Sequence, residues 1–365
     1  MRVLDSTPKA DGFYMPSELS LHRSTFILWP ERPDNWRLGA KPAQEAFKKV
    51  VEAITKHEPV TIGVSPSQYA NVLGMHLPMT RVVEMSQNDS WIRDSGATFV
   101  VNGKGVLRAV CWGFNGYGGL EDGIYFPWDL DDLNSDEMAE LEWVDRYRTP
   151  DFILEGGSIH SDGEGTILVT EECLLSKGRN PNMSKDEIEQ KLKDYLGAEK
   201  VLWIPHGLYA DEDTNGHVDN ICQFVAPGKV VLAWMEDEND PQHAISQEAY
   251  DYLSNETDAK GRKLEIVKIH VPGPLYYTDE EVSTLDVIEG TLPRKGGGRL
   301  AASYVNYYNC NGAVILPIFN DPHDQEAIET LQKLFPDKVI ETVDSREILL
   351  GGGNIHCITQ QVPKP

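Results

Sequence analysis

The segment GGSIHSDGEGTILVT (Gly156–Thr170) has the pattern of a β-hairpin, in which two short strand-forming runs flank the pair Asp162-Gly163. Asp-Gly and Asn-Gly pairs favour the tight turns that join antiparallel strands. Three further segments follow the same plan, and they are 97–112 around Asn102-Gly103, 221–235 and 304–319. Each hairpin lies near a helical segment and a further apolar strand, such as 59–64, 200–205 or 338–343.

Helical segments separate these strands. Residues 184–197 begin with the capping pair Ser184 and Glu187 and end at Gly197, which predicts a helix with a defined start and stop. Residues 41–57 have apolar side chains at helical spacing, which predicts an amphipathic helix. Its expected buried face consists of Phe47, Val50, Val51 and Ile54.

Two further helices are predicted at 240–253 and 321–335, because both segments begin with Asp-Pro. An aspartate at the N-cap followed by proline at the first helical position favours a helix start. The acidic segment 130–146 is a weaker helix candidate.

The strand and helix segments recur regularly along the chain. Roughly five strand–helix units fit its length, and the motif LEGGSIH (154–160) has an echo in LLGGGNIH (349–356). Regular recurrence is typical of repeat architectures, and no Gly/Ser-rich or Pro-rich linker interrupts the chain. We therefore predict an α/β fold in one closed domain that spans residues 1–365.

The charge balance narrows the range of ligands. The 365-residue chain has 33 Lys and Arg against 58 Asp and Glu, which gives a formal net charge of −25. Nucleic-acid binding needs a basic face, so nucleic acid is excluded as a partner. The negative charge fits a cationic ligand, although it also serves solubility alone.

Cysteine usage and hydropathy predict a cytoplasmic protein without a membrane partner. The cysteines are scattered and form no Cys-x-x-Cys pair, which argues against a disulfide framework or a zinc finger. No run approaches the roughly 20 apolar residues of a membrane span, and residues 1–24 lack the apolar core of a signal peptide. The five cysteines are Cys111, Cys173, Cys222, Cys310 and Cys357.

The segment GGGNIHC (351–357) is unusually apolar and glycine-rich for a chain end. Glycines such as Gly352 and Gly353 let backbone approach a ligand closely. Cys357 is then either a nucleophile at a cavity or an inert buried thiol, which is the commoner fate of a free cysteine. On this segment alone both alternatives stay open.

Other motifs supply partners for a cysteine nucleophile. TNGHVDN places His217 and Asp219 two residues apart, so both side chains can share one face of a strand. NDSWIRDSG contains Trp91 and Asp94, and Glu155 precedes a Gly-Gly turn.

A thiolate with a neighbouring histidine is the usual apparatus of cysteine catalysis. Clustered carboxylates oppose an oxyanion but pair well with a guanidinium, whose N–H groups form a fixed fork. Together, the cysteine, the histidine and the carboxylates predict that a cysteine attacks a guanidinium carbon.

These residues lie in motifs through which the chain resembles the agmatine deiminases, a branch of the guanidino-modifying (pentein) superfamily. The resemblance runs through most of the chain. The motifs are WPERPDNWR, NDSWIRDSG, FNGYGG, YFPWDLDD, LEGGSIHSDGEGT, CLLSKGRNP, NGHVDN, ASYVN, FPDK and GGGNIHCITQQVP.

The resemblance implies a five-bladed pseudo-symmetric α/β propeller built of ββαβ repeats. It implies hydrolysis of agmatine to N-carbamoylputrescine and ammonia, in arginine and putrescine metabolism, through a thiouronium on Cys357. His217 would be the general acid and base, and Glu155 would orient it and contact the guanidinium. Asp94 and Asp219 would clamp the guanidinium nitrogens, and Trp91 would pack on the methylene chain.

The resemblance also implies that no metal or organic cofactor is needed and that the partner is a small cationic guanidino compound. Members of the family often assemble, so a homo-oligomer is expected. The four cysteines other than Cys357 are assigned to packing.

Several positions depart from the family pattern. Ala97 follows Gly96 where proline is common, Gly116 and Tyr117 replace Ala-Trp, and Asn220 replaces an aspartate. The surroundings of His206 are also atypical. None of these changes removes a catalytic side chain, and we expect them to alter the distal end of the pocket, where a substrate's tail is recognised.

Four alternatives remain open from the sequence. An amidinotransferase would pass the amidino group to an amine instead of water. A deiminase could act on another guanidine, including free arginine, for whose carboxylate only Arg93 is near enough in sequence. His217 and Asp219 could instead ligate a metal in a hydrolase. The chain could also be a propeller that binds guanidines or polyamines without catalysis.

Overall fold

A computed structural model describes residues 1–365 as five small sheets, each of three or four strands, with helices between them. Every sheet contains one ββαβ unit, in which the first two strands are antiparallel and the third strand is parallel to the second. A parallel neighbour requires a crossover, and the helices provide it. The predicted α/β fold built of ββαβ repeats is confirmed.

The first three units, in chain order, use these elements. The first contains β5 (Thr98–Val101), β6 (Leu107–Gly113), α4 (Gly119–Asp122), η1 (Asp131–Leu133), α5 (Asn134–Leu141) and β7 (Arg146–Ile153), with β1 (Val3–Leu4) at its edge. The second contains β8 (His160–Ser161), β9 (Thr166–Thr170), α6 (Glu171–Leu174), α7 (Lys185–Leu196) and β10 (Lys200–Ile204). The third contains β11 (Cys222–Ala226), β12 (Lys229–Trp234), α9 (Pro241–Ser254) and β13 (Glu265–His270).

The last two units complete the ring. The fourth contains β14 (Tyr308–Cys310), β15 (Ala313–Ile318), α11 (Asp324–Leu334) and β16 (Val339–Asp344). The fifth contains β17 (Gln360–Pro363), β2 (His22–Leu28), α1 (Lys41–Ile54), β3 (Val60–Val64), α2 (Tyr69–Leu73) and β4 (Thr80–Glu84). Short helices in the connections are α3 (Ile92–Ser95), η2 (Gly156–Ser158), α8 (Val218–Ile221), α10 (Asp279–Ser283) and α12 (Arg346–Leu349).

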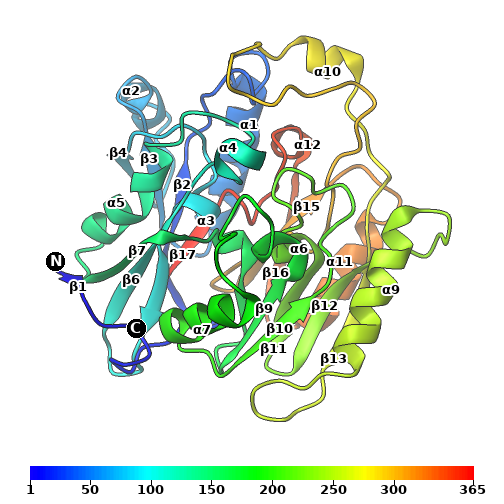
Figure 1. The fold of residues 1–365 in the computed structure, drawn as a ribbon. Helices are drawn as coiled ribbons and strands as arrows, with labels where there is room; N and C mark the ends of the chain where they lie inside the picture. The colour runs from blue at the N-terminus through cyan, green and yellow to red at the C-terminus, as the bar shows by residue number, and fades with distance from the viewer.

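The fifth unit is assembled from both ends of the chain. Strand β17 pairs antiparallel with β2, with Gln360 opposite Phe26 and Gln361 opposite Thr25. Figure 1 shows β17 in red beside β2 in blue, in the interior of the molecule. The C-terminal segment is therefore a structural strand, which explains its apolar composition.

The predicted hairpins and most predicted helices are present. The turns at Asn102-Gly103 and Asp162-Gly163 join antiparallel strands, and both glycines have positive φ values. The expected face of α1 is fully buried. Ser184 and Glu187 form the capping box of α7, and Asp240 caps α9.

Two helix predictions need correction. Helix α11 begins at Asp324 instead of directly after Asp321, because the Asp321 carboxylate accepts from the His323 backbone N–H in a turn before the helix. The acidic helix ends at Leu141, well before residue 146, because Arg146 is the first residue of β7 and pairs with Ala109 in the sheet. Sheet pairing overrides local helix propensity there.

The helices of the structure are all too short or too polar to cross a lipid bilayer. The long, continuous runs of buried residues lie in the strands instead, and β3, β5 and β9 are buried at every position.

Replacing Ser184 by alanine should lower the free energy of unfolding by about 1 kcal/mol, because the hydroxyl accepts from the Glu187 N–H at the start of α7. Urea unfolding measures the change. Ser254→Ala is the control, since that exposed hydroxyl only bonds the Tyr250 carbonyl at the end of α9. Equal stability of the two variants would contradict the importance of the cap.

Candidate active site

The candidate site lies where the first strand of each unit begins, and every unit contributes to it. All its side chains are at most 4% exposed. The contributing residues, each just before the strand named, are Asp94 (β5), Glu155 (β8), His217 and Asp219 (β11), Asn306 (β14) and Cys357 (β17). Repetition of one unit thus brings together side chains that are far apart in the sequence.

Cys357 lies next to a carboxylate and an amide. Its Sγ is 3.7 Å from Asp219 Oδ2, and the Asn306 Nδ2 group donates to Sγ at 3.3 Å. Burial, together with the Asp219 and Asp94 carboxylates, raises the pKa of Cys357 well above its usual value. These effects favour the protonated thiol of Cys357. Asn306 lies in the motif ASYVN, and no role for it followed from the sequence.

The Asp94 carboxylate accepts two hydrogen bonds, both from neutral groups. Its Oδ2 accepts from the Tyr117 hydroxyl at 2.8 Å, and its Oδ1 accepts from the Gly157 N–H at 2.9 Å. Burial, together with the nearby Asp219 carboxylate, raises the pKa of Asp94 to about 6 despite the lowering effect of His217. A cationic ligand would relieve this carboxylate.

His217 lies between Asp94 on one side and Glu155 and Cys173 on the other. Its Nδ1 is 3.6 Å from Asp94 Oδ1, and neither ring nitrogen has a hydrogen-bond partner. Burial disfavours the charged imidazole, but Asp94, Cys173 and Glu155 together outweigh burial and hold the pKa of His217 well above its usual value. The histidine therefore has a proton to donate.

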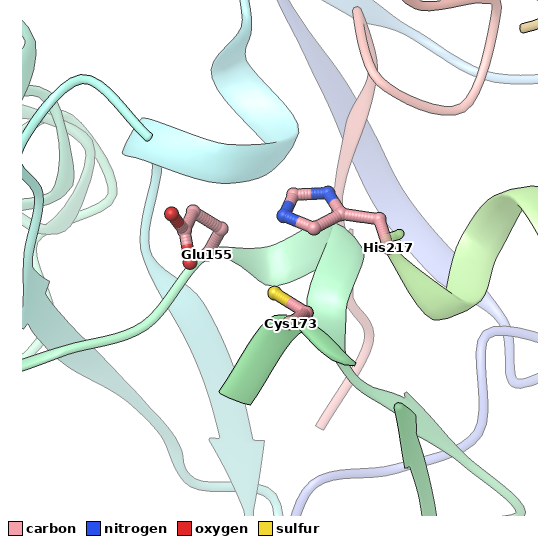
Figure 2. Close-up of side chains that lie close together, drawn as sticks. All are labelled: Glu155, Cys173 and His217. Atoms are coloured by element: carbon pink, nitrogen blue, oxygen red, sulfur yellow. The ribbon is translucent and has the colours of Figure 1, made fainter. Parts of the chain in front are cut away.

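Figure 2 shows Glu155, Cys173 and His217 converging on one space. Glu155 Oε1 accepts from Arg179 Nε at 2.8 Å, while Oε2 has no partner. Glu155 is thus close to His217 but not hydrogen-bonded to it. The three side chains form the one group whose Glu, Cys and His ligand atoms, all within 4.8 Å of one another, could hold a metal. Asp219 is not part of that group, so the predicted alternative of a His217–Asp219 metal centre has no support.

Asp219 is supported from behind by a buried ionic chain. His356 Nδ1 is 2.8 Å from Asp219 Oδ2, and His356 Nε2 is 2.9 Å from Glu18 Oε2. A histidine can donate from both nitrogens only as imidazolium. Burial and Arg93 oppose that charge, but the contacts with Glu18 and Asp219 leave the pKa of His356 raised. Asp219 Oδ1 has no partner and is free for a ligand.

Arg93 does not line the cavity. Its Nη1 donates to Glu18 Oε1 at 3.0 Å, and the side chain is buried. The alternative of a free-arginine substrate therefore lacks the cation that sequence analysis considered for its carboxylate.

The site opens into a small cavity. Trp91 forms one wall; its indole N–H donates to Asp89 Oδ2 at 3.0 Å, and its ring packs on Trp36. The remaining lining residues are Asp94, Tyr117, Ile124, Asp213, Thr214, Gly351, Gly352, Gly353 and Cys357.

The glycine run is required because neighbouring side chains lie very close to its backbone. A Cβ on Gly353 would lie 2.7 Å from the Trp91 ring and 3.1 Å from Cys357 Sγ. Gly352 has a φ of +110°, and a Cβ there would collide with Asp213. Both predicted backbone positions therefore line the cavity, as expected.

An ion pair lies beside the cavity and includes one of its lining residues, Asp213. Arg294 Nη1 is 2.6 Å from Asp213 Oδ2, and Arg294 Nη2 donates to the Gly351 carbonyl at 2.8 Å. Arg294 belongs to the long connection between β13 and β14, which also contains α10.

Of the positions that depart from the family pattern, only Tyr117 lines this cavity. His206 is half-exposed between Glu172 and Glu248, outside the cavity, so the expectation that it shapes the distal pocket is wrong. Asn220 donates to Asp211 at 2.9 Å behind the site. Ala97 is buried against Met138.

Comparison with known proteins agrees with this geometry. Residues 14–363 match the family described as Porphyromonas-type peptidyl-arginine deiminase. The agmatine deiminase of Pseudomonas aeruginosa (strain LESB58) is 54% identical over 361 residues, which cover 99% of this chain and 98% of that protein. The chain belongs to the agmatine deiminase family.

Solved structures of agmatine deiminases place the same fold around the site. The Enterococcus faecalis enzyme superposes with a TM-score of 0.97 at 50% identity, covering 100% of this chain and 99% of that one. A Campylobacter jejuni agmatine deiminase with substrate bound, carrying a cysteine-to-serine substitution, has a TM-score of 0.82 at 26% identity and covers 96% of both chains. The predicted family resemblance is confirmed.

Gly353→Ala should lower kcat/KM for a guanidino substrate by about 100-fold, because the added methyl group displaces Trp91 or Cys357 by a substantial fraction of an ångström. Steady-state kinetics measure the change. The matched control is Gly74→Ala, at an exposed helix end, which should leave kcat/KM unchanged. Wild-type kinetics in Gly353→Ala would show that the cavity tolerates a Cβ.

Tyr117→Phe should raise KM for a cationic substrate by about tenfold. The substitution removes the donor that holds Asp94 Oδ2, and a hydrogen bond to a charged group contributes about 1.5–3 kcal/mol. Initial-rate measurements over a range of substrate concentrations test this. Tyr14→Phe, at an exposed ring, serves as the control, and an unchanged KM in Tyr117→Phe would remove Tyr117 from substrate recognition.

Proposed function

We propose that this protein is an agmatine deiminase that hydrolyses agmatine to N-carbamoylputrescine and ammonia. The observation that carries the proposal is the thiol of Cys357 in a cavity that the buried carboxylate of Asp94 also lines, with Asp219 Oδ2 3.7 Å from the sulfur. A carboxylate pair beside a nucleophile suits a cationic electrophile and opposes an oxyanion. The names of the full-length relatives support the same substrate.

The guanidinium is bound by charge and by shape. In the proposed complex, its N–H groups donate to Asp219 Oδ1 and Asp94, which replaces water lost on burial. Trp91 packs on the methylene chain, and Gly352 and Gly353 give the substrate access to Cys357. The buried charge of the substrate and those of the two carboxylates compensate one another.

Substrate binding also activates the nucleophile. The carboxylates that raise the pKa of Cys357 are neutralised when the guanidinium lies between them, so the thiol loses its proton to solvent at that point. The thiolate is thus formed in the complex with substrate, next to the carbon it attacks.

The chemical steps follow from the positions of the side chains. The Cys357 thiolate adds to the guanidinium carbon, and the His217 imidazolium protonates one amino group, which leaves as ammonia. A thiouronium remains on sulfur. His217, now neutral, takes a proton from water, and the hydroxide adds to the same carbon. Expulsion of the thiolate, with loss of the hydroxyl proton, gives the ureido product. In this scheme Glu155 holds the substrate end near His217.

Some sequence-based expectations lie beyond this proposal. A cytoplasmic location, a homo-oligomeric state and a single domain over residues 1–365 remain predictions.

The decisive experiment is mass spectrometry of the purified protein with agmatine, following both the small molecules and the Cys357 peptide. We expect N-carbamoylputrescine, ammonia and an amidino adduct on Cys357. Cys357→Ser should lose at least about 1,000-fold in kcat, since the nucleophile is removed. Cys222→Ser, at a buried thiol outside the site, is the control. Full turnover in Cys357→Ser, or agmatine left unconverted by the wild type, would overturn the proposal.

A further inference from the structure

We propose that Glu155, Cys173 and His217 form an inhibitory binding site for a thiophilic divalent cation such as Zn²⁺. The effect on activity rests on the proposed function, because the ion would occupy the histidine that serves as acid and base. The ion is an inhibitor in this proposal and takes no part in turnover.

The donor set is that of a zinc site. Its three residues come from different elements: Glu155 precedes η2, Cys173 lies on α6, and His217 precedes α8. Their ligand atoms all lie within 4.8 Å of one another (Figure 2). Bonds of about 2.0–2.3 Å to zinc would draw these atoms together by about 1 Å.

The site also has unused donor atoms. His217 Nδ1 and Nε2 and Glu155 Oε2 are buried and have no hydrogen-bond partner. The three side chains are at most 1% exposed. Buried polar groups are normally satisfied, and the free ones here point to a ligand that supplies positive charge.

The nearby cation does not occupy this position. Arg179 donates to Glu155 Oε1, to the Tyr117 carbonyl and to the Thr214 carbonyl, which fixes its guanidinium on the far side of the carboxylate. Glu155 Oε2 therefore remains available. Asp94, which lies 3.6 Å from His217, adds negative charge that favours a dication.

Binding is a proton exchange without redox chemistry. The ion forms a bond to the Cys173 sulfur and takes the lone pair of one nitrogen of His217. The Cys173 thiol and the His217 imidazolium each release one proton to solvent in this step. His217 can then neither protonate the leaving nitrogen nor deprotonate water. Zn²⁺ and Co²⁺ share the preference for sulfur and nitrogen donors, whereas Mg²⁺ prefers oxygen and should not bind here.

Cobalt absorption tests the site without turnover. Metal-free protein, freed of chelator by gel filtration, is titrated with Co²⁺ and followed for a thiolate-to-cobalt charge-transfer band. The band should persist in Cys357→Ser and in the control Cys222→Ser, and it should vanish in Cys173→Ser. A band that vanishes in Cys357→Ser and persists in Cys173→Ser places the ion on the other thiol and overturns the proposal.

Inhibition provides the second measurement. Agmatine turnover is measured against buffered free Zn²⁺, with Mg²⁺ in parallel. The wild type should be inhibited reversibly, with recovery on adding EDTA. The inhibition constant of Cys173→Ser, relative to its own uninhibited rate, should rise at least about tenfold. An unchanged inhibition constant for Zn²⁺ in Cys173→Ser would show that the ion does not bind at this site.

The two measurements separate the two proposals. A Cys173-dependent cobalt band in a protein that leaves agmatine unconverted would refute the proposed function and keep the metal site. Turnover without any cobalt band, in the wild type or in Cys357→Ser, would keep the function and refute the site. If Cys173→Ser does not fold, the Cys357→Ser spectrum still decides, because Cys173 is then the remaining thiol near His217.

Discussion

The pairing of β17 with β2 is the interaction on which the rest of the molecule depends. It joins residues near the two ends of the chain into one sheet, and it closes the ring of five units. The same pairing fixes the turn before β17, where Cys357 lies opposite Asp219 and Asn306. A register shift of one residue would turn the buried side chains of β17 to the opposite face. Ring closure and nucleophile placement are therefore one structural event.

The second constraint is that several carboxylates are buried close together. The protein compensates their negative charges unequally. Glu18 and Asp219 receive cationic partners from behind, through Arg93 and His356. Asp94 receives neutral donors from Tyr117 and Gly157, and its cationic neighbour His217 lies 3.6 Å away without a hydrogen bond to it. Burial still raises the pKa of Asp94 to about 6. The rear of the site is thus a network of hydrogen bonds and ion pairs, whereas the front retains carboxylate oxygens without a partner on Glu155 and Asp219. A cationic ligand is the group that completes it.

Much of the fold follows from local signals in the sequence. The Asn-Gly and Asp-Gly turns and the Ser184 cap predict their elements correctly, because each depends on residues a few positions apart. The start of α11 is not predictable in this way, since the choice between a turn at Asp321 and a helix depends on competing side-chain hydrogen bonds. The end of the acidic helix depends on Arg146 joining a strand that begins at Leu107.

The residues of the candidate site that lie in recognisable sequence motifs could be predicted, whereas the residues that support them could not. Cys357, His217, Asp94, Glu155 and Asp219 do meet in space, as the chemistry of the set required. The supporting residues were missed for a physical reason: His356 and Glu18 are 338 positions apart, and no local pattern marks them as partners. Cys173 was assigned to packing because only the three-dimensional structure shows it beside His217. His206 was misplaced because an unusual residue in a motif need not face the cavity.

Charge also explains how the proposed reaction would end. The guanidinium carries the charge that Asp94 and Asp219 need, whereas the ureido group that replaces it is neutral. Once ammonia and product form, the two carboxylates lose their counterion in a buried site, and the interaction that favoured binding is withdrawn. An enzyme that bound substrate mainly by shape would hold the nearly isosteric product equally well. Recognition by buried carboxylates instead distinguishes substrate from product, because only the substrate carries a positive charge, and the raised pKa of Asp94 reflects the cost of its buried negative charge.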